Sequence, residues 1–184
     1  MAEAIVAAAE EARPVRVDLI RRNRTLALCI AAAVFVLDQA VKWIVTNLLQ
    51  LPERLTADWL PFFRLNWVPN HGVSMGFLTA NGELQRWLLV ALTAAICIFV
   101  AAWLWRERRR DDAIALALIL GGALGNILDR VRLGYVVDYA DLHFGDWRPF
   151  LVFNIGDAAI TIGVLLLVLR ALLTRERKAP REKV

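Results

Sequence analysis

Residues 87–105 read WLLVALTAAICIFVAAWLW, nineteen consecutive residues without a charged side chain. A helix of this length crosses the hydrocarbon core of a bilayer, about 30 Å thick, because each residue adds about 1.5 Å. The segment lacks the polar stripe that a helix of a soluble bundle carries on its outer face. The sequence therefore predicts a transmembrane helix here.

The composition of the whole chain agrees with a membrane protein. Of the 184 residues, 59% are hydrophobic and the mean hydropathy is +0.51, whereas an ordinary soluble domain is about 45–50% apolar. Three further apolar segments are long enough to span: residues 25–49, 113–133 and 150–173. We therefore expect an all-α polytopic membrane protein with four transmembrane helices at 25–173, an N-terminal extension at 1–24 that is mobile or lies on the surface, and a basic tail at 174–184.

The distribution of positive charge predicts the orientation. Fifteen Lys and Arg residues flank the membrane on the side of both termini, whereas six lie at the opposite side, in or next to loops 50–86 and 134–149. Cytoplasmic segments carry such an excess, so both termini are predicted to be cytoplasmic. The sequence pI of about 9.6 then reflects topology, and we do not expect nucleic-acid binding.

The long outer loop, residues 50–86, contains more than a linker. Residues 61–68 read PFFRLNWV, which is rich in the aromatic and β-branched residues that favour a strand. Pro69, Asn70 and Gly72 follow as a turn signal. We expect a small extracytoplasmic sheet that lies on the membrane face.

Several polar residues interrupt the spans. An ionisable group near the bilayer centre costs at least about 2.5–3.5 kcal/mol, so each needs a partner or a role. Asp38 and Lys42 are four residues apart and can pair on one helix face; a purely structural ion pair and a functional pair both fit this spacing. Two other spans each carry an Asn and an Asp three residues apart on one face: Asn126 with Asp129, and Asn154 with Asp157.

All of these polar groups are predicted to lie in one layer. Spans one and three run outward and span four runs inward, so the polar residues of each fall in its extracytoplasmic half. Asn70, Asp138 and Asp141 come from the outer loops. A proton or ion pathway needs polar groups through the full depth of the membrane, which argues against a transporter. Glycines 121, 122 and 125 are typical of close helix packing.

Carboxylates are the groups in this layer that fit a reaction. His71 and His143 lack metal-ligand spacing, so no metal or other cofactor is expected, and Ser74 is not in a nucleophile elbow. Two adjacent aspartates can share a proton, and one can then activate water while the other protonates a scissile carbonyl. The residues leave three partners for Asp157 open: Asp129, Asp138 and Asp141.

Four motifs occur together: DQAVK at 38–42, NHGVSMGF at 70–77, GGALGNILDRVRLGYVVDY at 121–139 and FNIGD at 153–157. They closely resemble the lipoprotein signal peptidases, the type II signal peptidases of bacteria, and the resemblance covers residues 25–173. It implies a multi-pass enzyme of the bacterial inner membrane with a small extracytoplasmic β-cradle. Such an aspartyl endopeptidase removes the signal peptide from diacylglyceryl-modified prolipoproteins and cuts before the lipidated cysteine.

The resemblance also implies roles for individual residues. Asp138 and Asp157 match the catalytic pair, and Asp141 is then expected to be a solvated loop acid. Eight residues match supporting or substrate-binding positions: Asp38, Lys42, Asn70, Gly72, Asn126, Asp129, Arg130 and Asn154. Within this set we expect the two asparagines 126 and 154 to hold substrate backbone groups and Arg130 to pair with a carboxylate or carbonyl. The chain departs from the family pattern at Val73–Met75, where small residues are usual, and at Gly156, where Ala is usual.

Other functions remain to be weighed against this one. A non-catalytic membrane protein of the same fold could bind lipidated peptides without cutting them, and a small transporter is a third interpretation. For the peptidase, the expected partners are diacylglyceryl-prolipoprotein substrates and membrane lipids, and the expected oligomeric state is a monomer.

Overall fold

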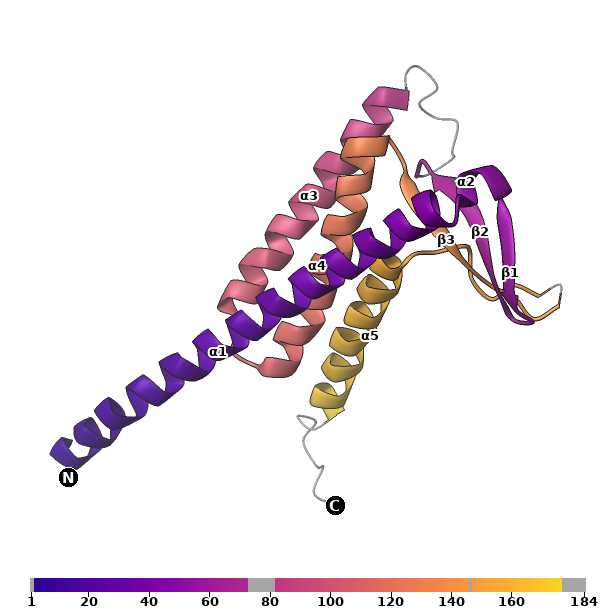
Figure 1. The fold of residues 1–184 in the computed structure, drawn as a ribbon. Helices are drawn as coiled ribbons and strands as arrows, with labels where there is room; N and C mark the ends of the chain where they lie inside the picture. Colours follow the sequence, from indigo (N-terminus) through magenta and orange to yellow (C-terminus); the bar gives the residue numbers. More distant parts are fainter. Residues whose placement is uncertain (1, 73–81, 146, 177–184) are drawn as a thin grey trace.

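Figure 1 shows a computed structural model of the chain, which describes residues 2–72, 82–145 and 147–176. The helices are α1 (Ala2–Trp43), continued by the π-helical turn η1 (Ile44–Leu48), α2 (Leu51–Arg54), α3 (Gly82–Arg106), α4 (Arg110–Leu133) and α5 (Ile155–Glu176). The strands are β1 (Thr56–Leu60), β2 (Phe63–Asn70) and β3 (Val136–Leu142).

Four helical segments are long and apolar enough to cross a membrane: Ile20–Leu48, Glu83–Arg106, Arg110–Leu133 and Ile155–Leu173. Helix α4 is the central one, because it packs against α1, α3 and α5. Half of its most apolar window is buried, against 17–22% for the other three, which leave most of their apolar side chains exposed for contact with lipid. The predicted fold class, four transmembrane helices with a small sheet, is confirmed.

The glycines of α4 explain how α1 and α5 come so close to it. A Cβ atom on Gly121 would lie 2.5 Å from the Ala31 carbonyl oxygen of α1. One on Gly122 would lie 2.3 Å from the Gly156 carbonyl oxygen of α5. Both distances are too short for any side chain, so small residues are required at these two helix crossings.

The sheet is antiparallel, with β2 between β1 and β3. Val68 lies opposite Asp138 and Asn70 opposite Val136 in the β2–β3 register. In Figure 1 the sheet is joined to the end of the bundle that lies far from the two chain termini, and it projects to one side of the helices. A buried apolar cluster fixes it to the end of the first span: Val45, Leu51, Leu65, Val137, Tyr139 and Ala140.

Strand β3 lies in a region predicted to be a loop, residues 134–149. Every residue from Val136 to Asp141 is buried, because the segment is covered on both faces. A strand of this kind shows no alternation of apolar and polar residues. The pattern that indicated β2 is therefore missing from β3.

Two helices have ends that differ from the predicted ones. Helix α5 begins at Ile155, five residues after the start of the predicted fourth span, because Phe153 instead pairs with Ala140 through two backbone hydrogen bonds of 2.8 and 3.0 Å. Residues 2–24, predicted to be an extension, continue α1 as one helix. The unusual residues Val73–Met75 and the end of the basic tail from 177 lie outside the described residues.

Candidate active site

Asp138 lies in the middle of β3, at the junction of the bundle and the sheet. Helix α4 ends at Leu133 and is capped by Gly134, whose φ of 87° is a left-handed conformation that suits glycine. The chain then turns back as β3, and this places Asp138 beside β2 with only 2% of the residue exposed. One carboxylate oxygen accepts a hydrogen bond from Asn154 Nδ2 at 2.6 Å and the other from Asn70 Nδ2 at 2.9 Å.

Asp157 lies in the first turn of α5 and is fixed by the start of that helix. Its backbone N–H donates to Asn154 Oδ1 at 2.9 Å, and the Asn154 N–H donates to Asp157 Oδ2 at 3.3 Å. This reciprocal pair has the form of a capping box, with Asn154 as the N-cap. The other oxygen, Oδ1, accepts from Asn126 Nδ2 at 2.8 Å. Asp157 is only partly buried, unlike Asp138.

Two asparagines connect the two acids. Asn154 Nδ2, which donates to Asp138, also lies 3.2 Å from Asn126 Oδ1. Lys42 Nζ donates to that same Asn126 oxygen at 3.0 Å, so the Asn126 amide nitrogen must face Asp157. Both asparagines thus direct their amide donors at carboxylates, and their expected role in holding substrate backbone groups stays a prediction.

Lys42 is the centre of a buried ion cluster behind these asparagines. Its Nζ lies 2.7 Å from Asp38 Oδ2 and 2.8 Å from Asp129 Oδ2, and all three side chains are at most 4% exposed. Asp38 also accepts the backbone N–H of Gly156 at 2.9 Å. The cluster therefore joins α1, α4 and the first turn of α5, which carries Asp157.

The surroundings of Asp138 favour its protonated form. Burial is the main cause and the nearby charge of Asp157 the second, and together they raise the pKa of Asp138 to about 6. The hydrogen bonds from Asn70 and Asn154 and the charge of Lys42 oppose this rise. Near and below about pH 6, Asp138 therefore holds a proton beside the charge of Asp157, and that proton belongs to both acids together.

Gly72 and Arg130, two other predicted site residues, have different environments in the structure. Gly72 has a φ of 92°, and its N–H donates to Asn70 Oδ1 at 2.9 Å, which orients the amide toward Asp138. Arg130 lies within electrostatic range of both acids, but within 2–72, 82–145 and 147–176 it forms no ion pair and its Nε has no hydrogen-bond partner. Its carbonyl oxygen instead accepts from Arg86 Nε at 2.7 Å.

The prediction for Asp141 is wrong. It is not a solvated loop acid, since it lies in β3 with 1% of the residue exposed, and Arg148 Nη2 is 3.5 Å from its carboxylate. The burial of β3 on both faces is the physical reason. Asp141 is therefore unsuitable as an inert control for substitutions at the candidate pair.

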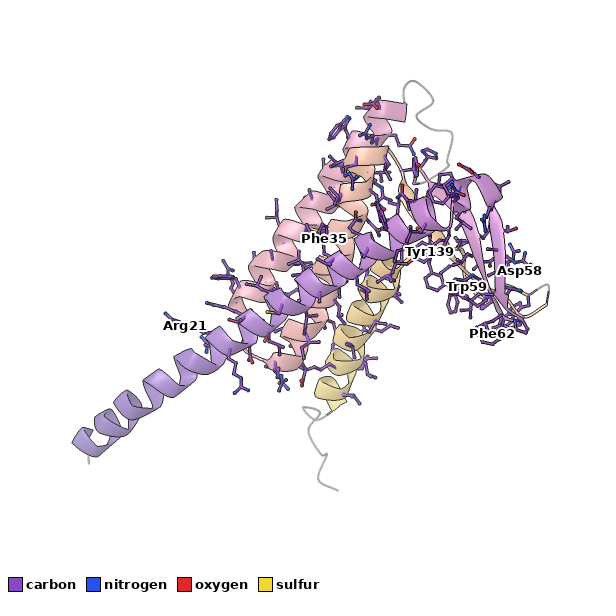
Figure 2. All side chains as sticks on the ribbon, viewed as in Figure 1. Arg21, Phe35, Asp58, Trp59, Phe62 and Tyr139 are labelled. Carbon is purple, nitrogen blue, oxygen red and sulfur yellow. The ribbon has the colours of Figure 1, made fainter. Side chains whose placement is uncertain are left out.

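Gln39 and Tyr139 lie beside the site but were not predicted from the sequence as site residues. Gln39 Nε2 donates to Asp129 Oδ1 at 2.9 Å; its place next to Asp38 in DQAVK was the available signal. Tyr139 is buried beside Asp138, and Figure 2 shows it where the bundle meets the sheet, whereas Asp58, Trp59 and Phe62 project from the far part of the sheet. Burial raises the pKa of the Tyr139 phenol above its usual range, so it stays uncharged.

Comparison with known proteins decides the family of this chain. The family described as Signal peptidase (SPase) II matches residues 30–173. The chain belongs to the signal peptidase II family. A lipoprotein signal peptidase of Rhizorhabdus wittichii is 57% identical over 162 residues, 88% of this chain and 94% of that protein. One of Sphingopyxis alaskensis is 55% identical over 150 residues, 82% of this chain and 87% of that protein.

A solved structure extends the similarity to the three-dimensional fold. A bacterial membrane enzyme determined by the in meso method at 2.3 Å resolution has a TM-score of 0.70 and 28% sequence identity, and the match covers 87% of this chain and 94% of that one. The chain is therefore a multi-pass bacterial membrane protein with a signal peptidase II function. The non-catalytic alternative is not favoured.

Proposed function

We propose that this signal peptidase II is an aspartic peptidase that cuts diacylglyceryl-modified prolipoproteins before the lipidated cysteine, with Asp138 and Asp157 as its catalytic pair. The observation that carries the proposal is the connection of these two acids through Asn126 and Asn154, together with a pKa of about 6 for Asp138. Asp129, the rival partner, is paired with Lys42 at 2.8 Å and so is committed to the ion cluster.

The chemistry needs one charged and one protonated carboxyl group. The charged acid takes a proton from a water molecule as the water oxygen attacks the scissile carbonyl carbon, and the protonated acid gives its proton to the carbonyl oxygen. The tetrahedral intermediate then collapses, the C–N bond breaks, and the amine of the lipidated cysteine leaves with a proton from the pair. No other reactant is consumed.

The proposed setting is the outer surface of the bacterial inner membrane. A substrate whose acyl chains stay in the bilayer presents its scissile bond at headgroup depth, and the candidate pair lies at the end of the spans that carries the sheet. By the charge distribution, the termini are cytoplasmic and this end is extracytoplasmic. We propose a monomer in contact with membrane lipids.

The decisive experiment is cleavage of a purified diacylglyceryl prolipoprotein by wild-type protein, Asp138→Asn, Asp157→Asn and a matched control, Asp58→Asn. Asp58 lies on the same sheet with its side chain 78% exposed, so the control removes a carboxylate charge without touching the pair. We expect each catalytic substitution to lower kcat by at least about a hundredfold, the typical loss of an acid–base group, and the control to cut normally.

The folding of each variant is checked by its thermal unfolding curve in detergent. Near-normal turnover by Asp138→Asn or Asp157→Asn would refute the assigned pair. Wild-type protein that binds the lipoprotein without cutting it would refute the peptidase function itself.

A further inference from the structure

An apolar groove begins at Asp157 and follows the outer side of α5. Its volume is about 270 Å³. Its walls come from Ala158, Thr161 and Ile162 of the helix and from Phe150, Leu151 and Phe153 of the preceding segment. Among the described residues that line it, Asp157 is the sole charged one. The groove therefore connects one acid of the proposed pair to the region that the spans expose to lipid.

The groove lies on the accessible side of the two acids. Asp138 is buried among β3, Asn70 and Asn154, whereas Asp157 is only partly buried. The groove wall is itself open, since Leu151 is 90% and Ile162 51% exposed. A ligand that reaches the pair from the bilayer can thus lie along this wall without displacing any described side chain of the bundle.

We infer that this groove binds an acyl chain of the diacylglyceryl group of the substrate, an inference that rests on the proposed function. The lipid is attached to the residue directly after the scissile bond, so the start of its chain must lie close to the acids. The groove begins at one of them, Asp157, and continues toward the interior of the membrane along α5.

The groove has room for a single hydrocarbon chain. From Asp157 to Ile162 it follows five residues of helix, about 8 Å at about 1.5 Å per residue, and its volume is about 270 Å³. An unbranched hydrocarbon chain is narrow and can follow the groove from its start at Asp157.

The groove acts by shape rather than by hydrophobic attraction. Lipid tails in the bilayer are already in an apolar environment, so burial against Phe150 or Ile162 brings little transfer free energy. What the groove supplies is a fixed position for the chain relative to Asp157. A side chain that fills the groove should therefore raise KM for a long-chain substrate and leave a short-chain substrate unaffected.

The test compares two lipopeptides of identical sequence, one dipalmitoyl and one dibutyryl, with wild-type protein and Thr161→Phe. Thr161 is exposed on the groove wall, so the new ring fills the groove. We expect KM for the dipalmitoyl substrate to rise by about tenfold or more, the usual scale of a steric misfit, with kcat for both substrates and KM for the dibutyryl substrate little changed. The matched control is Val164→Phe, an equally bulky change at a position of α5 that is 43% exposed but outside the groove.

A second variant protects the test from a folding defect. Leu151→Ala removes a side chain that is 90% exposed, so it should fold normally, and it should also weaken the preference for the dipalmitoyl substrate. Cleavage of the dibutyryl substrate reports folding in every variant.

The outcomes separate the inference from the proposed function. Equal effects of Thr161→Phe on both lipopeptides, or the same effect from Val164→Phe, would overturn the groove assignment alone. A changed preference among peptides that differ before the cysteine, without a change in chain preference, would show that the groove binds a signal-peptide side chain, and would also overturn it. Wild-type protein that cuts neither lipopeptide would overturn the proposed function, and the inference with it.

Discussion

At the scale of the residue, the state of Asp138 depends on opposing effects. Burial and the charge of Asp157 raise its pKa, while two amide donors and Lys42 lower it, and the result is about 6. The carboxylate oxygens face different asparagines, Asn154 from the start of α5 and Asn70 from the end of β2. The protonation of the pair is thus tuned by residues that belong to three separate elements.

Removal of one amide donor should shift the pH dependence of cleavage. Asn70 donates to the charged form of Asp138 at 2.9 Å and so lowers its pKa; Asn70→Ala should raise that pKa above about 6. Activity falls at high pH when both acids are ionised, so the alkaline limb of the kcat profile should move to higher pH. The measurement is kcat against pH for this variant and for Asp58→Asn, and an unmoved limb would contradict the assignment.

At the scale of the element, the α4–α5 crossing sets the position of the acids. Gly122 and Gly156 bring the two backbones together, and four residues along α4 from Gly122, Asn126 reaches Asp157 at 2.8 Å. The Asn154 cap starts α5 at the same level. The geometry of the site is therefore a consequence of helix packing as much as of the acids themselves.

A single added methyl group at this crossing should impair both stability and catalysis. In Gly122→Ala the new Cβ would lie 2.3 Å from the Gly156 carbonyl oxygen, so the helices must separate, at a typical cost of about 1–3 kcal/mol. We expect a lower unfolding temperature and a kcat that falls more than KM rises, because Asn126 moves away from Asp157. Ala91→Val, which adds volume at an exposed position of α3, is the control. Wild-type kcat in Gly122→Ala would show that the close crossing is not needed for the reaction.

At the scale of the whole molecule, charge and geometry both divide the protein into two ends. The chain termini lie at one end of the bundle and the sheet at the other (Figure 1), and the excess of Lys and Arg is at the end with the termini. Four acidic side chains are buried among the described residues, and all four lie toward the end with the sheet: Asp38, Asp129, Asp138 and Asp141. The proposed reaction therefore belongs to one face of the membrane.

The orientation can be measured on intact cells. In a variant without Cys29 and Cys97, a cysteine placed at Asp58 of the sheet should react with a membrane-impermeant maleimide from outside. A cysteine placed at Arg108, between α3 and α4, should react only after the inner membrane is opened. The reverse labelling pattern would contradict the predicted topology and place the candidate pair on the cytoplasmic side.

The four spans and several local pairings could be predicted from the sequence because they depend on neighbours along the chain. An apolar run of about twenty residues must cross a bilayer whatever it packs against, and residues three or four apart share a helix face, as Asp38 with Lys42 and Asn154 with Asp157 do. Residue spacing left three aspartates as possible partners of Asp157, and the resemblance to the family motifs pointed to Asp138.

The tertiary structure decided the features that depend on segments far apart in sequence. Strand β3 and the burial of Asp141 could not be predicted, because a strand covered on both faces carries no alternating pattern. The contact of Asn70 with Asp138, 68 residues apart, and the groove beside Asp157 arise where separate elements meet. Such contacts are set by helix crossings and strand register, and these depend on the packing of the whole chain rather than on any local spacing.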